Sequence, residues 1–236
     1  MVLFPALAQS DNQGNQTISS FSQSKKTLLK KVFYDRRITI YCGARFDKNK
    51  NITLPDGFVA SVYKKRATRV EWEHVVPAEN FGRAFKEWRE GSDICVSSKG
   101  KPYRGRKCAD KASLEYRYMQ ADMYNLFPSV GAVNAARQNY NFVMLSGNSK
   151  SDFGSCDMRI EGDKAQPPER ARGRIARAYM YMDMVYPKYS MSKQQRKLMV
   201  AWDKQYPIEE FECIRNKRIK AIQKNINPIL DKQCEN

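Results

Sequence analysis

Six cysteines place the strongest constraint on how this chain of 236 residues can fold, since each oxidised pair ties two segments together. They are Cys42, Cys95, Cys108, Cys156, Cys213 and Cys234. None lies in a Cys-x-x-Cys pair with metal-site spacing, and the chain has one histidine, so a zinc cage is not expected. The even number fits three disulfides, for which the sequence alone allows fifteen connectivities.

The first residues favour an oxidising compartment. Ala6-Leu7-Ala8 forms an A-x-A cleavage pattern, although no basic segment or full apolar core precedes it. We interpret residues 1–8 as the remnant of a secretory signal peptide, 9–20 as a polar disordered segment, and 21–236 as a single domain. The protein is therefore expected in the periplasm or outside the cell, with its cysteines paired.

The charge of the chain predicts a polyanionic partner. Lys and Arg number 42 against 25 Asp and Glu, which gives a formal net charge of +17. Such a field attracts nucleic acid or an anionic membrane surface. No long apolar run or basic amphipathic stretch favours the membrane, and aromatic residues interleaved with the charge favour nucleic acid over a role in solubility alone.

Hydrophobic periodicity predicts strands in the first part of the chain. Apolar residues alternate with polar ones at 38–42, and the run 58–63 is a plausible second strand. A further strand includes Val70 and Trp72 and is expected to end near His74, because Pro77 cannot continue a sheet ladder.

Helices are expected elsewhere, with the last third largely helical. Apolar spacing predicts one from Leu28 to Phe33 and another through Phe81, Phe85 and Trp88. Candidate N-caps are Ser113, Ser129 and Ser192, the last in a capping box with Gln195. Pro167 and Pro168 open a helix whose buried stripe is Ile175, Ala178, Met182 and Val185. Four arginines of that helix are interpreted as partly a solvated face and partly phosphate contacts: Arg170, Arg172, Arg174 and Arg177.

The only histidine offers the one obvious base. It follows Glu73, and a carboxylate suits a hard cation such as Mg²⁺ whereas a neutral imidazole can take a proton from water. In a regular strand Glu73 and His74 face opposite sides, so both can serve one site only where the pleat is broken. Taken alone, such a pair is more often a surface carboxylate beside a core histidine.

Several motifs occur together in a specific order. They read Arg-x-Glu-Trp-Glu-His-Val-Val-Pro-Ala at 69–78, Ala-Asp-x-x-Asn-Leu-x-Pro at 121–128, Gly-x-Val-Asn at 131–134, and Pro-Pro-Glu-Arg-Ala-Arg-Gly at 167–173, followed by Ala-Trp-Asp-Lys at 201–204 and Asn-Ile-Asn-Pro at 225–228. The set resembles the bacterial endonuclease I family of periplasmic or secreted nucleases, from about Phe21 to Cys234.

The resemblance implies a fold and a site. It implies a single mixed α+β domain, mostly helical, with a ββα-metal (His-Me finger) core. Glu73 and Asn134 match the family's metal ligands, for Mg²⁺ with Ca²⁺ or Mn²⁺ able to occupy the same site, and His74 matches the general base. Arg106 matches an arginine that binds the scissile phosphate, with Arg104 as a competitor because the family pattern usually has one more residue before the cysteine.

Two departures from the family pattern stand out. Gln120 replaces a glutamate, so an auxiliary carboxylate near the metal is lost. Ala44 and Glu87 stand where the family often has cysteines, as though one disulfide were missing as a pair. Of the cysteines that remain, Cys95 and Cys108 are predicted to pair, because they are close in sequence and bracket the Gly-rich loop that carries both candidate arginines.

The expected function is that of an endonuclease, monomeric and not inserted in a membrane. It is expected to hydrolyse DNA, and RNA as well, with little sequence preference, because contacts to phosphate carry little base information. A histidine base and a metal-stabilised 3′ leaving group imply products with 5′ phosphates. The alternative is a secreted basic nucleic-acid-binding protein without catalysis, which leaves His74 unexplained.

Overall fold

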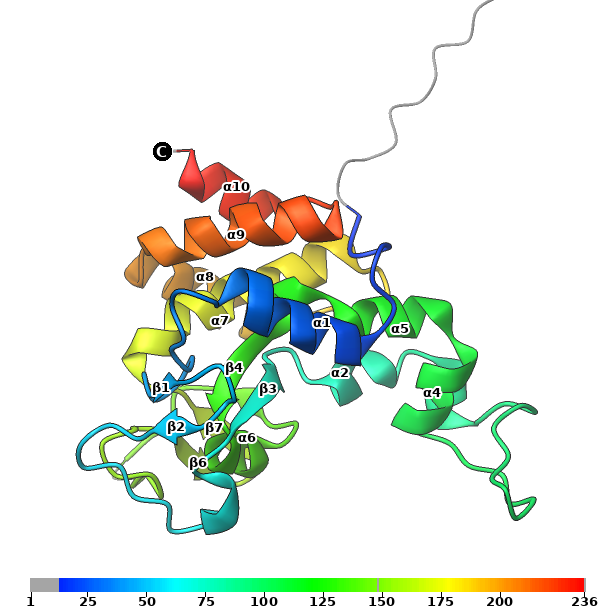
Figure 1. Cartoon of the computed structure of the whole chain (residues 1–236), viewed down its shortest axis with the longest axis horizontal. Helices are drawn as coiled ribbons and strands as arrows, with labels where there is room; N and C mark the ends of the chain where they lie inside the picture. Colours follow the sequence, from blue (N-terminus) through cyan, green and yellow to red (C-terminus); the bar gives the residue numbers. More distant parts are fainter. Residues whose placement is uncertain (1–12, 148, 236) are drawn as a thin grey trace, which may run out of the picture.

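The computed structural model describes residues 13–147 and 149–235, which form a mixed α+β structure (Figure 1). The first half contains α1 (Phe21–Thr27), the π-helical turn η1 (Leu28–Val32), β1 (Arg45–Phe46), β2 (Ile52–Thr53), η2 (Lys64–Arg66), β3 (Val70–His74), α2 (Ala78–Gly82), α3 (Lys86–Arg89), α4 (Arg106–Ala112) and α5 (Leu114–Ala121). The second half contains η3 (Met123–Asn125), β4 (Leu126–Val130), α6 (Gly131–Arg137), β5 (Asn141–Phe142), β6 (Arg159–Glu161), β7 (Lys164–Gln166), α7 (Glu169–Val185), α8 (Lys193–Gln205), α9 (Glu210–Gln223) and α10 (Pro228–Cys234).

A ββα unit lies at the centre of the fold. Strand β3 pairs antiparallel with β4, which places Glu73 opposite Phe127 and His74 opposite Leu126. Helix α6 follows β4 directly. The strand ends at His74, as predicted, so the pleat does not continue beyond that residue. Helices α2 to α5 are inserted between the two strands, and α4 and α5 lie to one side of the pair (Figure 1).

The C-terminal helices form a layer against this unit (Figure 1). Helix α7 begins after Pro168, and its predicted stripe of Ile175, Ala178, Met182 and Val185 is buried. Ser192 caps helix α8 as predicted, because its hydroxyl accepts from the Gln195 N–H at 3.1 Å. The side chain of Gln195 does not complete a capping box but donates to the carbonyl of Phe142. None of the helices among the described residues is long and apolar enough to cross a membrane.

Two predicted strands are wrong. Residues 39–42 form a turn in which four consecutive side chains are buried. Contacts to distant segments hold this turn: the Tyr41 hydroxyl donates to Glu73, and the carbonyls of Thr39 and Ile40 accept from Arg170. The segment 58–63 is an irregular surface loop whose apolar side chains Val59 and Val62 are exposed.

Two helix predictions also need correction. Ser129 lies inside β4 rather than at a cap, and α6 begins after Val130 without a side-chain cap. The helix expected through Phe81, Phe85 and Trp88 is divided into α2 and α3, because Phe85 adopts extended backbone angles. By contrast, Ser113 caps α5 as predicted, by accepting from the Tyr116 N–H.

Residues 13–20 pack against the domain, in contrast to the predicted disorder. Asn15 is buried, and its side-chain amide donates to the carbonyls of Ile18 and Tyr118. Its backbone N–H donates to the Tyr186 hydroxyl at 2.7 Å. The predicted signal remnant at 1–8 lies outside the described residues.

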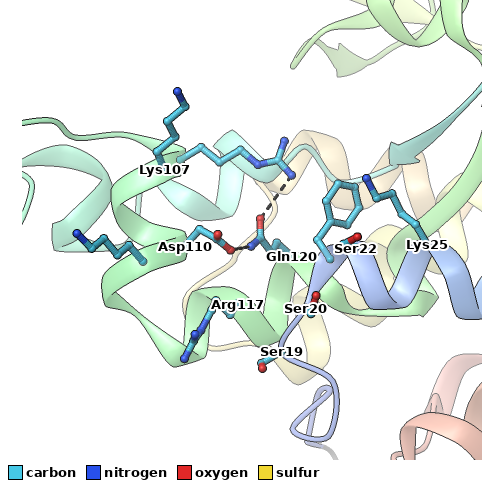
Figure 2. Close-up of a pocket in the computed structure, with 11 residues that line it drawn as sticks. Ser19, Ser20, Ser22, Lys25, Lys107, Asp110, Arg117 and Gln120 are labelled. Atoms are coloured by element: carbon cyan, nitrogen blue, oxygen red, sulfur yellow. Dashed lines mark hydrogen bonds between the residues drawn. The ribbon is translucent and has the colours of Figure 1, made fainter. Parts of the chain in front are cut away.

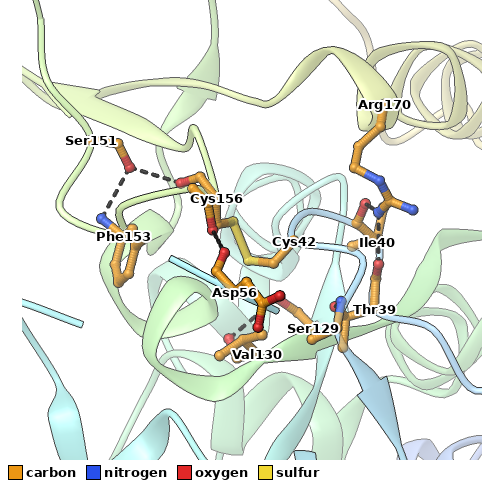
Figure 3. The surroundings of a disulfide bond; sticks show 12 residues. Thr39, Ile40, Cys42, Asp56, Ser129, Val130, Ser151, Phe153, Cys156 and Arg170 are labelled. Atoms are coloured by element: carbon orange, nitrogen blue, oxygen red, sulfur yellow. Dashed lines mark hydrogen bonds between the residues drawn. A yellow bond between two sulfur atoms is a disulfide. The ribbon is translucent and has the colours of Figure 1, made fainter. Parts of the chain in front are cut away.

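Three disulfides are present, and Cys95 pairs with Cys108 as predicted. The others join Cys213 to Cys234 and Cys42 to Cys156. Figure 3 shows the latter bond beside the turn that contains Thr39 and Ile40, with Arg170 on the far side of that turn. This cross-link ties the turn that carries Tyr41 to a segment 114 residues further along the chain.

Candidate active site

Glu73 and His74 both line one surface hollow of about 400 Å³, which we call the His74 hollow. Its wall also contains Asn134 from α6, Phe21 from α1 and Arg106 from α4. The end of a strand, the middle of a short helix, the first helix and the insertion between β3 and β4 therefore bring together side chains that are far apart in the sequence.

The Glu73 carboxylate is held from one side only. Its Oε1 accepts from the Tyr41 hydroxyl at 2.6 Å and from Arg137 Nη1 at 2.8 Å. Burial raises the pKa of Glu73, while Arg137 and the bond from Tyr41 oppose that rise. No described residue donates a hydrogen bond to Oε2, so this oxygen can bind a ligand.

Arg137 fixes the end of β3 as well as the carboxylate. It is completely buried, and its guanidinium donates to the carbonyls of His74 at 2.9 Å and Val75 at 2.6 Å. Its Cζ lies 4.3 Å from the ring centroid of Phe142. The planar fork of arginine suits this set of acceptors, which a lysine could not satisfy in the same geometry.

Asn134 is oriented by Glu71, the other carboxylate on the same side of β3. Asn134 Nδ2 donates to Glu71 Oε2 at 2.8 Å, and Glu71 also accepts from Arg66 Nε at 2.7 Å. Because a carboxylate only accepts, this bond determines which end of the amide is nitrogen and leaves Oδ1 free of hydrogen bonds among the described residues. Gly131 makes room for Glu71, since a Cβ there would lie 2.9 Å from Glu71 Oε1.

His74 is held in one tautomer. Its Nε2 lies 2.8 Å from the Gln120 carbonyl oxygen, which can only accept, so the proton is on Nε2 and Nδ1 keeps its lone pair. Phe21 packs against the imidazole with ring centroids 4.8 Å apart. Burial, followed by the charge of Arg106, lowers the pKa of His74 to about 3. The ring is therefore neutral at neutral pH, and Nδ1 accepts no hydrogen bond from the described residues.

Arg106, rather than Arg104, reaches the His74 hollow. Arg106 Nη2 donates to Gln120 Oε1 at 3.5 Å, and its Cζ lies 5.3 Å from the centroid of the Phe21 ring. Arg104 donates to the Arg89 carbonyl and lines a different hollow. The role of Arg106 at a phosphate stays a prediction.

Gln120 lies between an arginine and a carboxylate. Its side-chain amide accepts from Arg106 and donates to Asp110, one helical turn after Arg106 on α4 (Figure 2). Gln120, on α5, therefore contacts Arg106, the predicted phosphate-binding arginine. The carboxylate that Gln120 contacts is Asp110, which lies on α4.

A second hollow of about 740 Å³ adjoins the first and shares Phe21 and Arg106 with it. We call it the basic groove, because five cations line it: Lys25, Arg106, Lys107, Lys111 and Arg117. Several of these side chains surround the groove in Figure 2. Burial, followed by the charges of Lys50 and Arg106, lowers the pKa of Lys25.

The four arginines of α7 all have partners within the protein, and their contacts to phosphate stay a prediction. Arg170 donates to two backbone carbonyls, and Arg174 donates to Glu209. Arg172 bonds to the Tyr206 hydroxyl, and Arg177 forms a buried pair with Glu212.

The donor atoms fit a hard divalent cation. One carboxylate oxygen of Glu73 and the amide oxygen of Asn134 are free of hydrogen bonds to described residues and line the same hollow. Oxygen ligands of this kind suit Mg²⁺ or Ca²⁺. Within the described residues no cluster of three or more His, Cys, Asp or Glu side chains could hold a metal, so the protein would supply few of the ligands.

Sequence reasoning missed the residues whose hydrogen bonds orient Glu73 and Asn134. Glu71 carried a usable signal, because it lies two positions before Glu73 and so faces the same side of β3. Arg137 and Tyr41 carried no such signal. A buried arginine does not appear in hydrophobic periodicity, and Tyr41 reaches Glu73 from a turn 32 residues earlier.

A β3–β4–α6 unit that presents a carboxylate, an amide and a histidine to one hollow defines a mixed α+β enzyme of the ββα-metal nuclease class. The family model described as Endonuclease I matches residues 20–234 of this chain. The chain belongs to the endonuclease I family.

Curated relatives match almost the whole chain. An extracellular deoxyribonuclease of Aeromonas hydrophila is 39% identical over 220 residues, which cover 90% of each protein. A periplasmic deoxyribonuclease of the same species is 39% identical over 227 residues, 93% of this chain and 89% of the relative. Endonuclease-1 of Buchnera aphidicola subsp. Acyrthosiphon pisum (strain APS) is 34% identical over 241 residues, 93% of this chain and 90% of the relative.

Proposed function

We propose that the protein is a secreted or periplasmic endonuclease that hydrolyses DNA and RNA without sequence preference and leaves 5′ phosphates. The observation that carries the proposal is the tautomer of His74, which leaves Nδ1 with a free lone pair in a side chain that lines the same hollow as Glu73 and Asn134. The names of the extracellular and periplasmic relatives support DNA as a substrate and the location. RNA is included because cations recognise phosphates in both nucleic acids.

His74 would take the proton from the attacking water. The imidazolium that forms keeps its Nε2 hydrogen bond to the Gln120 carbonyl, so the ring does not need to turn during the reaction. Burial keeps the imidazole neutral beforehand, because it lowers the pKa of His74. Arg106 would bind the phosphate through a charge that does not depend on pH.

Glu73 and Asn134 would hold the metal, Mg²⁺ in our proposal, with Ca²⁺ or Mn²⁺ able to take the same place. When bound, the ion stabilises negative charge on the phosphoryl oxygens and supplies a bound water for the leaving 3′ oxygen. Arg137 and Tyr41 keep one oxygen of Glu73 engaged and leave the other for the ion. Glu71 does the same for Asn134 by binding its nitrogen.

Replacing His74 by alanine tests the proposed base. We expect cleavage of plasmid DNA to fall by about 10²–10⁴-fold, because that is the usual contribution of a general base. Binding of a labelled duplex should persist, since many cations contribute to it. Wild-type protein with EDTA is the parallel control and should also lose cleavage. If wild-type protein with Mg²⁺ cuts neither DNA nor RNA, the protein is a binder without catalysis and the proposal fails.

Replacing Glu73 by glutamine tests the metal site. The variant should need more Mg²⁺ to reach half-maximal cleavage, because a neutral amide binds the ion less tightly than a carboxylate. Partial rescue at raised Mg²⁺ is the expected result. A melting curve is needed alongside, because the change also removes the charge partner of Arg137. A folded variant whose residual cleavage ignores Mg²⁺ at every concentration would remove Glu73 from the ligand set.

A further inference from the structure

The backbone of Gln138 adopts a conformation that favours glycine. This residue ends α6 with φ 50° and ψ −130°, and the Tyr140 N–H donates to the Arg137 carbonyl across it at 3.2 Å. Gln138 is therefore the second of the four residues of a β-turn. A residue with positive φ at that position is usually glycine, because a side chain is strained there. Strain of this kind persists where the rest of the structure imposes it, and it clusters at functional sites.

The Gln138 side chain stands between two hollows. It lines the His74 hollow, and it also lines a groove of about 690 Å³ that meets this hollow through Gln138 and Asn139. We call this second feature the amide groove, because uncharged polar side chains dominate its wall: Asn80, Gln138, Asn139, Asn141, Ser192 and Gln195. Gln138 itself is exposed, and its Nε2 donates to the Tyr140 hydroxyl at 2.9 Å.

The few charges of the amide groove have partners. Arg83 forms an ion pair with Glu79 on the same helical turn. A hydrogen bond involving Asp163 contributes to a raised pKa of Tyr140. The basic groove differs sharply, because five cations line it and its only carboxylate, Asp110, is bonded to Gln120. The basic groove is therefore suited to phosphates, whereas the amide groove offers neutral donors and acceptors.

We propose that the amide groove is a subsite for the nucleoside on one side of the scissile phosphate, and that Gln138 binds the sugar or base of that nucleoside. This inference rests on the proposed nuclease function. An amide both donates and accepts, as sugars and bases do, and it adds no charge that would attract phosphate instead. The strand would run from the basic groove through the His74 hollow into the amide groove, with its phosphates held mainly on the first side.

The substitution Gln138→Gly distinguishes a role in substrate binding from a purely structural role, because we expect it to raise stability while it lowers cleavage. Relief of the strain should raise Tm by about 2–4 °C. Loss of the amide should lower kcat/KM on DNA by about three- to tenfold, the range of a neutral hydrogen bond. Lys224→Gly is the matched control, because Lys224 also has a positive φ, 64°, but lines none of the three hollows described above. It should raise Tm without changing cleavage.

Modified oligonucleotides show whether Gln138 contacts substrate. Each has one ordinary phosphodiester among phosphorothioates, and a propanediol spacer replaces the nucleoside on one side of it or the other. The loss of kcat/KM caused by Gln138→Gly should persist on the full oligonucleotide and on one spacer oligonucleotide. It should disappear on the other spacer oligonucleotide, which lacks the nucleoside that Gln138 binds. Equal losses on both, no loss on any, or a lower Tm would overturn the proposal. If wild-type protein with Mg²⁺ cuts none of them or any plasmid, the nuclease function itself fails.

Discussion

Arg177 in α7 and Arg106 in α4 show how the surroundings of an arginine decide what it does. Arg177 is buried and bonds to Glu212 through two nitrogens, at 2.9 and 2.6 Å, and to Asp203 at 2.9 Å. Arg106 is exposed, forms no ion pair with any described residue, and contacts a neutral amide and an aromatic ring. The first arginine has its anions within the protein, whereas the second can bind an anion from solution.

This contrast extends to the two regions as a whole. In the C-terminal helical layer, Arg174 and Arg177 are paired with Glu209, Glu212 and Asp203, so their charge stabilises the packing of helices. In the basic groove the cations are left without carboxylate partners among the described residues, at a cost in mutual repulsion. Net charge alone therefore does not locate the nucleic-acid site, because much of it has a structural role.

The largest expected effect is on stability, from Arg177→Met. The change removes the cation of Asp203 and leaves Glu212 only the longer contact to Arg174 at 4.0 Å, and breaking a buried pair in this way costs about 3–5 kcal/mol. For a chain of this size, Tm should fall by about 6–20 °C. Cleavage by the folded protein at low temperature should not change.

Lys220→Met is the matched control for that experiment. Lys220 forms an exposed pair with Asp231 on the same helical layer, at 2.8 Å, and such pairs contribute about 0–1 kcal/mol. Similar losses of stability in the two variants, measured by thermal and urea unfolding, would contradict the assignment of Arg177 to a buried structural pair.

A smaller effect on stability, but a specific one on turnover, is expected from Cys95→Ser/Cys108→Ser. The bridge closes a loop of 13 residues that ends two residues after Arg106, and closure is worth about 3 kcal/mol in the chain-entropy model. An arginine contributes to the transition state only while it is positioned, so kcat should fall at least tenfold.

The bridge Cys213–Cys234 provides the control for turnover. It spans 21 residues at the C-terminus, so Cys213→Ser/Cys234→Ser should lower Tm to a similar degree while kcat stays close to wild type at the same temperature. If both double variants lose turnover equally, the loss reflects general destabilisation and the positioning of Arg106 does not depend on its neighbouring disulfide.

The sequence predicted the parts of the site that lie on regular elements. The end of β3 at His74, the stripe of α7 and the Cys95–Cys108 pair follow from local rules of strand termination, helical spacing and loop length. Glu73 and His74 were proposed from their chemistry, the family resemblance assigned their roles and added Asn134, and the structure brings the three side chains to one hollow.

The remainder depended on contacts between distant segments. Tyr41 lies in a turn rather than a strand, because its hydroxyl binds Glu73 and the neighbouring Cys42 is joined to Cys156. The apolar run at 58–63 failed as a strand because it finds no partner strand among the described residues, apart from one bridge at Phe58. The arginines of α7 were assigned to solvent and phosphate because their partners, Glu209 and Glu212, lie more than 30 residues later.

The smallest expected effect concerns a single groove cation. Lys107 lines the basic groove, is exposed and forms no ion pair among the described residues, so Lys107→Ala should change stability by no more than about 0.5 kcal/mol. If it contacts one phosphate, the slope of log affinity against log salt should become shallower by about 0.9 for duplex DNA or 0.7 for a single strand. The measurement uses the His74→Ala protein, so that DNA is bound without being cut. Lys217→Ala, an exposed lysine on α9, is the control and should leave the slope unchanged. Equal changes from both lysines would mean that the field of the whole protein, rather than the basic groove, attracts the DNA.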